Sequence, residues 1–214
     1  MTVHASRVVG ILDLQTLASH AYSFDRAIMR AYGLGLRTFL LRAVGVSPSE
    51  QRAVWRWLEG ETPPGLRVLQ HASAVLPKGV RIDGRHFPSH HLRGEGAAYC
   101  EGRVGYSTHD AWELKRAEML GAQWAFVSPF MPSASKPGYG PCLGLEGVRS
   151  LAQSTTVPVF ALAGVDATTI KGLGAAGAAG VAVMGMLGHP EKEEELKQLL
   201  KAMEDELWCV QTPW

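Results

Sequence analysis

The sequence has few cysteines, and their positions argue against two common kinds of site. Its 214 residues include Cys100, Cys142 and Cys209, which lie far apart and form no Cys-x-x-Cys pair. A structural zinc site or a disulfide framework needs closely spaced or more numerous cysteines. Neither is expected here, and a small, odd number of cysteines is typical of a reducing compartment such as the cytoplasm.

Long hydrophobic runs and a strong charge of one sign are also missing. No apolar run reaches the length of about 18 residues that would predict a transmembrane helix, and the first residues do not resemble a secretory signal. The formal net charge is +1 and the basic residues are scattered, so binding to nucleic acid or to a membrane surface is not expected. With 46% hydrophobic residues, the composition indicates one soluble cytoplasmic domain over residues 1–214.

What the sequence does contain is an alternation of short apolar runs with helical patterns. Strands are predicted at 7–13, 38–41, 66–69, 80–82, 103–107, 124–127, 157–163 and 180–184, with no comfortable helix between the third and the fourth. Continuous apolar strands are typical of a parallel sheet covered on both faces. Eight such units predict an α/β fold, a single (β/α)8 TIM barrel with its site at the carboxyl ends of the strands. An open doubly wound sheet is the alternative, disfavoured because no Gly-x-Gly-x-x-Gly follows the first strand.

Two of the predicted helices have recognisable starts. Ser47, Pro48 and Glu50 have the spacing of a capping box with proline at the first helical position. The helix predicted at 109–120 follows Ser107 and Thr108, either of which is expected to cap it, and Trp112 is expected on its inner face.

The loop after the sixth strand, at 128–143, is rich in proline and glycine and holds two hydroxyls and a cation close together. Ser133, Ser135 and Lys136 are suited to an anionic group such as a phosphate. Taken alone, the stretch fits an ordinary solvated loop better. Gly164 and the Met184-Gly185 turn follow the last two strands, where barrels commonly hold a phosphate with backbone N–H groups, although plain helix-start turns are an equal alternative.

His109 is the candidate for acid–base chemistry, since it opens a helix directly after the fifth strand. The helix dipole disfavours a cation there, so a neutral imidazole is expected, and such a ring can transfer protons near neutral pH. The alternative is a first-turn histidine without chemistry. Further candidates lie at the ends of the predicted strands: Asp13, Arg42, Gln70 or His71, and Asp83.

Three other histidines, His86, His90 and His91, invite a metal interpretation that the sequence does not favour. Pro88 interrupts the helix that their spacing would need, and no acidic residue lies among them. A solvated or partly packed loop is expected, and no metal site is predicted. The segment 208–214 carries two tryptophans, which suggests a homo-oligomer contact or packing of the tail against the outer helices.

Several of these segments resemble one known family. Pro132-Ser-Ala-Ser-Lys-Pro-Gly138, followed by Gly144-Leu-Glu-Gly147, is similar to the P-T-x-T-K-P-G … G-L-E-G signature of the thiamine-phosphate synthase and TenI thiazole tautomerase superfamily. Gly105-Tyr-Ser-Thr-His109 resembles its G-x-S-x-H motif, and two later glycine-containing segments match in order and spacing. They are Ala161-Leu-Ala-Gly164, which resembles A-I-G-G, and Ala176–Met184, which resembles A-G-A-x-G-V-A-V.

The resemblance implies a TIM barrel that binds a small-molecule thiazole phosphate. Its phosphate would lie near Gly164, Met184 and Gly185, and the Ser133, Ser135 and Lys136 loop would match the hydroxyl-hydroxyl-lysine loop of the family. Arg42 is what remains of the Q-x-R-E-K segment that serves the pyrimidine diphosphate in the synthase.

The resemblance also separates two reactions and a non-catalytic alternative. The synthase carries magnesium-binding aspartates in N-D and Q-E-D segments after its third and fourth strands, whereas this chain has Gln70-His71 and Gly84-Arg85-His86. The expected function is therefore that of a TenI-like tautomerase, an isomerase without a cofactor that moves a proton through His109. The alternatives are a thiamine-phosphate synthase, which would use Mg²⁺, and a regulatory protein that binds thiazole phosphate without turnover.

Overall fold

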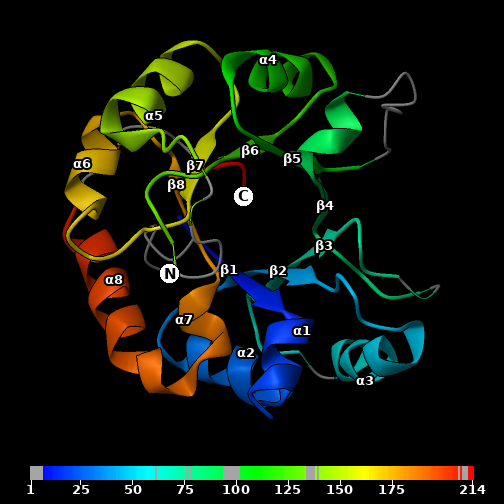
Figure 1. Cartoon of the computed structure of the whole chain (residues 1–214). Coiled ribbons are helices and arrows are strands. Elements are labelled where there is room, and N and C mark those ends of the chain that lie inside the picture. Colours follow the sequence, from blue (N-terminus) through cyan, green and yellow to red (C-terminus); the bar gives the residue numbers. More distant parts are fainter. Residues whose placement is uncertain are drawn as a thin grey trace.

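Eight parallel strands close into a barrel in the computed structural model (Figure 1). The structure describes residues 7–60, 62–75, 77, 79–93, 102–133, 138, 140–206, 208 and 212–214. The strands are β1 (Val8–Asp13), β2 (Thr38–Arg42), β3 (Arg67–His71), β4 (Gly84–Phe87), β5 (Val104–Thr108), β6 (Trp124–Val127), β7 (Val159–Leu162) and β8 (Gly180–Val183). Each pairs with its neighbours along the chain, and β8 pairs with β1. The predicted (β/α)8 barrel is confirmed.

The helices form a ring outside this barrel (Figure 1). They are α1 (Leu14–Ser19), α2 (Phe24–Gly33), α3 (Pro48–Glu59), α4 (Ala111–Met119), α5 (Gly144–Gln153), α6 (Ile170–Ala175), α7 (Gly185–Gly188) and α8 (Glu193–Asp205), with 3-10 turns η2 (Ser89–Leu92) and η3 (Pro190–Lys192). The described residues between β3 and β4 contain no helix, as expected. The capping box of Ser47 and Glu50 at the start of α3 is present. None of the helices in the described ranges is long and apolar enough to cross a membrane.

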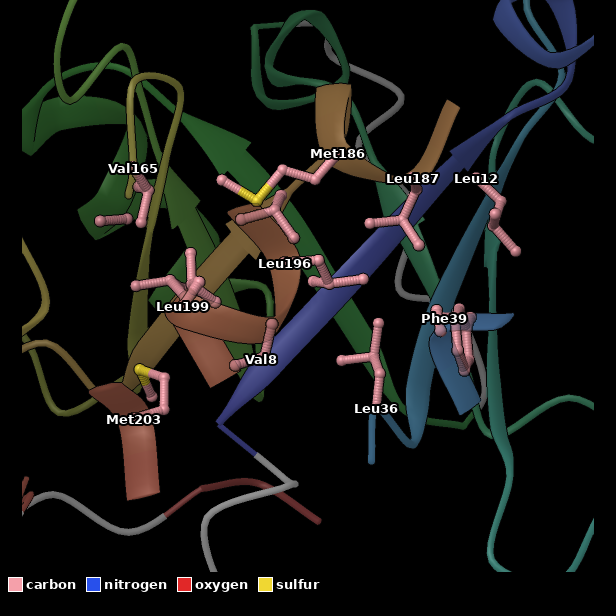
Figure 2. Packing of buried hydrophobic residues seen from close by; sticks show 14 of the residues in the cluster. Val8, Leu12, Leu36, Phe39, Val165, Met186, Leu187, Leu196, Leu199 and Met203 are labelled. Carbon is pink, nitrogen blue, oxygen red and sulfur yellow. The ribbon is translucent and has the colours of Figure 1, made fainter. Parts of the chain in front are cut away.

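The strands are apolar throughout because both of their faces are buried. Val8 and Leu12 of β1 belong to the cluster between the barrel and the helices, and Val9 and Ile11 belong to the cluster inside the barrel. Figure 2 shows part of the outer cluster, including Leu196, Leu199 and Met203 along one side of α8. This alternation explains why periodicity alone did not distinguish an inner face from an outer one.

Trp124 fills the amino end of the barrel. Its side chain is fully buried, and its indole lies where Gly105 and Gly84 have no side chain: a Cβ on Gly105 would lie 2.1 Å from Cε2 of Trp124. Trp214 packs against the same indole, with ring centroids 5.5 Å apart, so the chain ends beneath the centre of the barrel (Figure 1). Trp208 is buried beside α6. Trp208 packs against the outer helices, as the tail-packing alternative predicts. Trp214 packs instead against the cluster inside the barrel.

Two predicted elements are wrong in position. The fourth strand is β4 and not 80–82, because a buried polar side chain, His86, faces the barrel interior and breaks the apolar pattern. The helix expected at 109–120 is α4, which begins at Ala111 and is capped by Asp110. Its inner face carries Glu113 and not Trp112, which is 58% exposed. Two short helices, α1 and α7, had no prediction.

Candidate active site at the carboxyl end of the barrel

Asp13 and Arg42 form an ion pair where β1 and β2 end. The two residues are partners in the strand register, and an Nη1 of Arg42 donates to Oδ2 of Asp13. The other carboxylate oxygen accepts the N–H and the hydroxyl of Thr16, each at 2.9 Å, and so caps α1. The Asp13 side chain is 3% exposed and the Arg42 side chain 30%. The guanidinium of Arg42 is therefore partly exposed while its partner carboxylate is buried. This is the arginine that the sequence predicts to bind the ligand.

His71, at the end of β3, is a neutral donor beside this pair. Its Nδ1 accepts the N–H of Ser73 at 3.1 Å, and Ser73 Oγ, 2.7 Å from the same nitrogen, accepts the N–H of Ala43. Burial, together with the nearby charge of Arg42, lowers the pKa of His71 to about 4. At neutral pH the remaining proton is therefore on Nε2.

His86 lies deeper in the barrel, in a polar network rather than the predicted loop. Trp124 donates its indole N–H to Nδ1 of His86 at 3.1 Å, and Nε2 lies 2.9 Å from Ser107 Oγ. Complete burial holds the pKa of His86 well below its usual value. The ring is thus neutral, and both of its nitrogens contact protein groups.

His109 lies just above β5 and is anchored at two points. Its Nδ1 is 2.6 Å from the carbonyl oxygen of Ser128, so this nitrogen carries the proton and the lone pair of the neutral ring is on Nε2. Its backbone N–H donates to Oε2 of Glu113 at 2.8 Å. The ring orientation and tautomer are therefore set by the carbonyl at the start of the β6 loop.

The β6 loop joins His109 to the end of β7. After Ser128, the N–H groups of Phe130 and Met131 donate to Leu162 and Ala163 at 2.9 and 3.1 Å. A Cβ on Gly164 would lie 2.5 Å from Cβ of Met131, so the loop fills the side-chain position of this glycine. Ser133 follows this contact directly.

The turn after β8 differs from the turn after β7 in the space beside its glycine: the side-chain position is open at Gly185 and filled at Gly164. Met184 precedes the first residue of α7, Gly185, and a Cβ on Gly185 would meet no atom of the described chain within 4 Å. In this short helix the N–H groups of Leu187 and Gly188 donate to the carbonyl oxygen of Met184, at 3.0 and 3.4 Å. The open side-chain position of Gly185 leaves room for a phosphate to approach the backbone of the turn.

Most of the predicted site residues lie at one end of the barrel. The carboxyl ends of the strands carry Arg42, which ends β2, and His109, Gly164, Met184 and Gly185, which lie one or two residues beyond β5, β7 and β8; Ser133 lies in the β6 loop. Ser135 and Lys136 lie outside the described residues. Asp83 is wrong as a candidate, because it precedes β4 and accepts the N–H of Val68 at the amino end of β3. Glu113 was missed, since its only sequence signal is an acidic residue in the first turn of α4.

The magnesium site implied by the resemblance does not fit the residues at the ends of β3 and β4. Mg²⁺ prefers carboxylate oxygens, whereas His71 ends β3 and the segment after β4 carries His90 and His91 in η2. His90 is exposed and His91 is partly buried in this turn, which agrees with the solvated or partly packed segment expected for them. Asp13 is already paired and capping. No group of three or more His, Cys, Asp or Glu within the described ranges is arranged to hold a metal ion.

The protein is a (β/α)8 barrel whose candidate site, at the carboxyl end of the strands, combines His109, Arg42 and the turn at Gly185. The family described as thiamine monophosphate synthase matches residues 23–187. The chain belongs to this family, which confirms the superfamily resemblance without separating the synthase from the TenI branch.

The relatives are named for the synthase. A thiamine-phosphate synthase of Herpetosiphon aurantiacus is 27% identical over 187 residues, covering 85% of this chain and 88% of that protein. Thiamine-phosphate synthases of Caldivirga maquilingensis and Salinispora tropica are 37% and 41% identical, but the chain spans only 50% and 41% of their length.

Solved structures show the same fold at low sequence identity. Thiamine phosphate pyrophosphorylase from Pyrococcus furiosus superposes with a TM-score of 0.69 at 17% identity, covering 95% of this chain and 98% of that one. A geranylgeranylglyceryl phosphate synthase from Thermoplasma acidophilum reaches 0.65 at 15% identity, covering 96% and 97%. At this level of identity, and with the second protein named for a different reaction, this likeness concerns the fold alone.

Proposed function

We propose that this chain is an enzyme of thiamine biosynthesis that binds a thiazole phosphate at the carboxyl end of its barrel. The observation that supports this most is the convergence of His109, the β6 loop and the open Gly185 turn at one mouth. Backbone amides at Gly164, Met184 and Gly185 would hold the phosphate, and the family resemblance assigns Ser133, Ser135 and Lys136 to the same ligand. The thiazole ring would then lie beside His109.

The relatives favour a transferase, which joins the thiazole phosphate to a pyrimidine carried as a diphosphate. The thiazole nitrogen forms a bond to the pyrimidine methylene carbon, the carbon–oxygen bond to the diphosphate breaks, and pyrophosphate leaves. Since the strand ends do not fit Mg²⁺, the cations of Arg42 and Lys136 would balance the leaving charge, and no protein-bound metal is proposed.

Pyrophosphate release from the two substrates, measured with Mg²⁺ and with a chelator, tests the transferase. We expect release by the unaltered chain and a loss of at least about 10²-fold in Arg42→Ala, since a leaving group that lacks its electrostatic partner loses that much. Arg37→Ala is the control, because the Arg37 side chain donates to the carbonyls of Tyr32 and Leu36 before β2, at the other end of that strand from Arg42. No release under either condition excludes this reaction.

A second candidate, the tautomerase, is supported by the anchored tautomer of His109. One acid–base group is enough to move a proton toward an aromatic ring, and such a group typically contributes 10²–10⁴-fold. Conversion of a carboxythiazole phosphate, followed by its ultraviolet spectrum, should fall by that factor in His109→Ala but not in His20→Ala on the exposed end of α1. Equal rates for His109→Ala and the unaltered chain exclude it. Tight binding without turnover in either assay indicates a regulatory protein instead.

A further inference from the structure

A buried carboxylate stands directly behind His109. Glu113 is 1% exposed, yet it belongs to the first turn of α4. Its Oε2 accepts the backbone N–H of His109 at 2.8 Å, and its own N–H donates to Oδ1 of Asp110 at 2.7 Å. The first-turn amides and the helix dipole favour a negative charge at this place. The carboxylate therefore fixes the backbone of the residue before the helix cap.

The second oxygen of Glu113 is held by Arg93, which follows η2. Nε and Nη2 of Arg93 both donate to Oε1, at 2.9 and 2.6 Å. A buried charge is stable only when it is paired and hydrogen-bonded. Arg93 is 62% exposed, so this ion pair adds little stability by itself; its effect is to hold Glu113 in the orientation that reaches His109.

Comparison with α3 shows that this arrangement is not an ordinary helix cap. In α3, Glu50 accepts the N–H of Ser47, the cap residue itself, and both side chains are exposed. In α4 the equivalent carboxylate reaches one residue further, to His109, and is buried. Helix capping alone would need neither the burial nor the extra residue. The carboxylate of Glu113 thus contacts His109, the residue whose ring contacts the Ser128 carbonyl.

We propose that Glu113, oriented by Arg93, is a positioning residue for His109, and the proposal rests on the role of His109 in the proposed function. Glu113 fixes the backbone and the Ser128 carbonyl fixes Nδ1. Two anchors on one residue determine where Nε2 points. Without the contact to Glu113, the backbone of His109 can move and lengthen the contact between Nδ1 and the Ser128 carbonyl, which sets the tautomer. Displacement of a reacting group by about 1 Å can lower a rate 10²-fold.

The test compares Glu113→Ala, Glu113→Gln and a control, Glu118→Ala, in the full chain. Glu118 lies on the same helix and also accepts a backbone N–H from another segment, that of Thr156 at 2.9 Å, but it does not touch His109. ¹⁵N signals of the His109 ring report the tautomer, and steady-state kinetics in the two assays above report turnover.

In Glu113→Ala we expect a mixture of tautomers and a fall in kcat of about 10²-fold with KM changed by less than about threefold. Glu113→Gln can still accept the N–H of His109, so it should recover part of the single tautomer and part of kcat. Glu118→Ala should change neither the tautomer nor kcat. If Glu113→Ala does not fold, Arg93→Met applies the same test from the exposed side, with a smaller effect in the same direction.

A folded Glu113→Ala with an unaltered His109 tautomer and unaltered kcat overturns the proposal. Loss of activity without a change in the ring signals also overturns it, because a general loss of stability would do the same. If the unaltered chain turns over neither substrate set, the proposed function fails, and the ring signals alone then decide whether Glu113 positions His109.

Discussion

Replacing Gly105 by alanine tests the account of how the barrel interior is filled. A methyl group there would lie 2.1 Å from both Cε2 and Nε1 of Trp124, and Trp124 has no exposed surface through which to move away. Overpacking of this kind costs about 1–3 kcal/mol. Displacing the indole also breaks its hydrogen bond to His86, and a buried polar group left unpaired costs about 1–3 kcal/mol more.

The expected loss for Gly105→Ala is therefore about 3 kcal/mol, which lowers Tm by roughly 6–12 °C for a chain of this size. Urea unfolding followed by far-ultraviolet circular dichroism measures it. Trp124→Leu removes the obstructing ring, so Gly105→Ala in that background should cost less than about 1 kcal/mol, a coupling of about 2 kcal/mol between neighbouring sites.

The control is Gly33→Ala at the end of α2, where an added Cβ meets no described atom within 4 Å. It should be neutral or slightly stabilising, by up to about 1 kcal/mol, because alanine favours a helix. The reasoning is refuted if Gly105→Ala is as stable as the unaltered chain, or if it loses the same free energy in both backgrounds.

Three further predictions concern the mouth of the barrel. Because the pKa of His71 is lowered to about 4 in the folded chain, the unfolded chain binds more protons between pH 4 and about 6.5, so stability should fall by about 3 kcal/mol as pH drops through that range; urea unfolding at several pH values should show a flatter profile for His71→Gln, and an equal slope contradicts the assignment. Ala163 has a φ of +75°, so Ala163→Gly should raise stability by about 1 kcal/mol by relieving a left-handed conformation, and a lower Tm contradicts this. Arg30 donates to four carbonyls at the end of α7 and just beyond it, those of Met186, Leu187, His189 and Pro190, so calorimetry should show roughly tenfold weaker thiazole-phosphate binding for Arg30→Lys, because lysine cannot reproduce a planar fork of donors. Arg37→Lys is the matched control, and equal affinities contradict the Arg30 prediction.

The strands were predictable where local apolar pattern and burial agree. The runs at 38–41 and 124–127 coincide with β2 and β6 to within one residue. The fourth strand was not predictable from the local pattern. His86 can be buried there because Ser107 and Trp124, which are far from it in the sequence, supply its hydrogen-bond partners. The inner face of α4 was predicted wrongly for a related reason. Glu113 is buried because Arg93 and the backbone of His109 supply its hydrogen-bond donors.

The candidate site divides in the same way. The motif containing Gly105 and His109, together with the positions of Arg42, Gly164 and Gly185 after strands, could be read from the chain, because all parallel strands end at one mouth. Which glycine is open could not be read. Gly164 and Gly185 look alike in sequence, yet the β6 loop fills the space at Gly164 and leaves that at Gly185 open.

The sequence by itself determined the barrel, since a repeated order of apolar strand and helix admits few closed arrangements. It also placed Arg42, His109 and Gly185 at the mouth, but it wrongly placed Asp83 there. Only the tertiary structure decided the protonation state of each histidine. His71 and His86 are neutral because distant segments bury them, and His109 has one tautomer because Ser128, just after the next strand, faces its Nδ1. Burial and hydrogen bonds between segments far apart in the chain have no local pattern, so they exist only in the folded barrel.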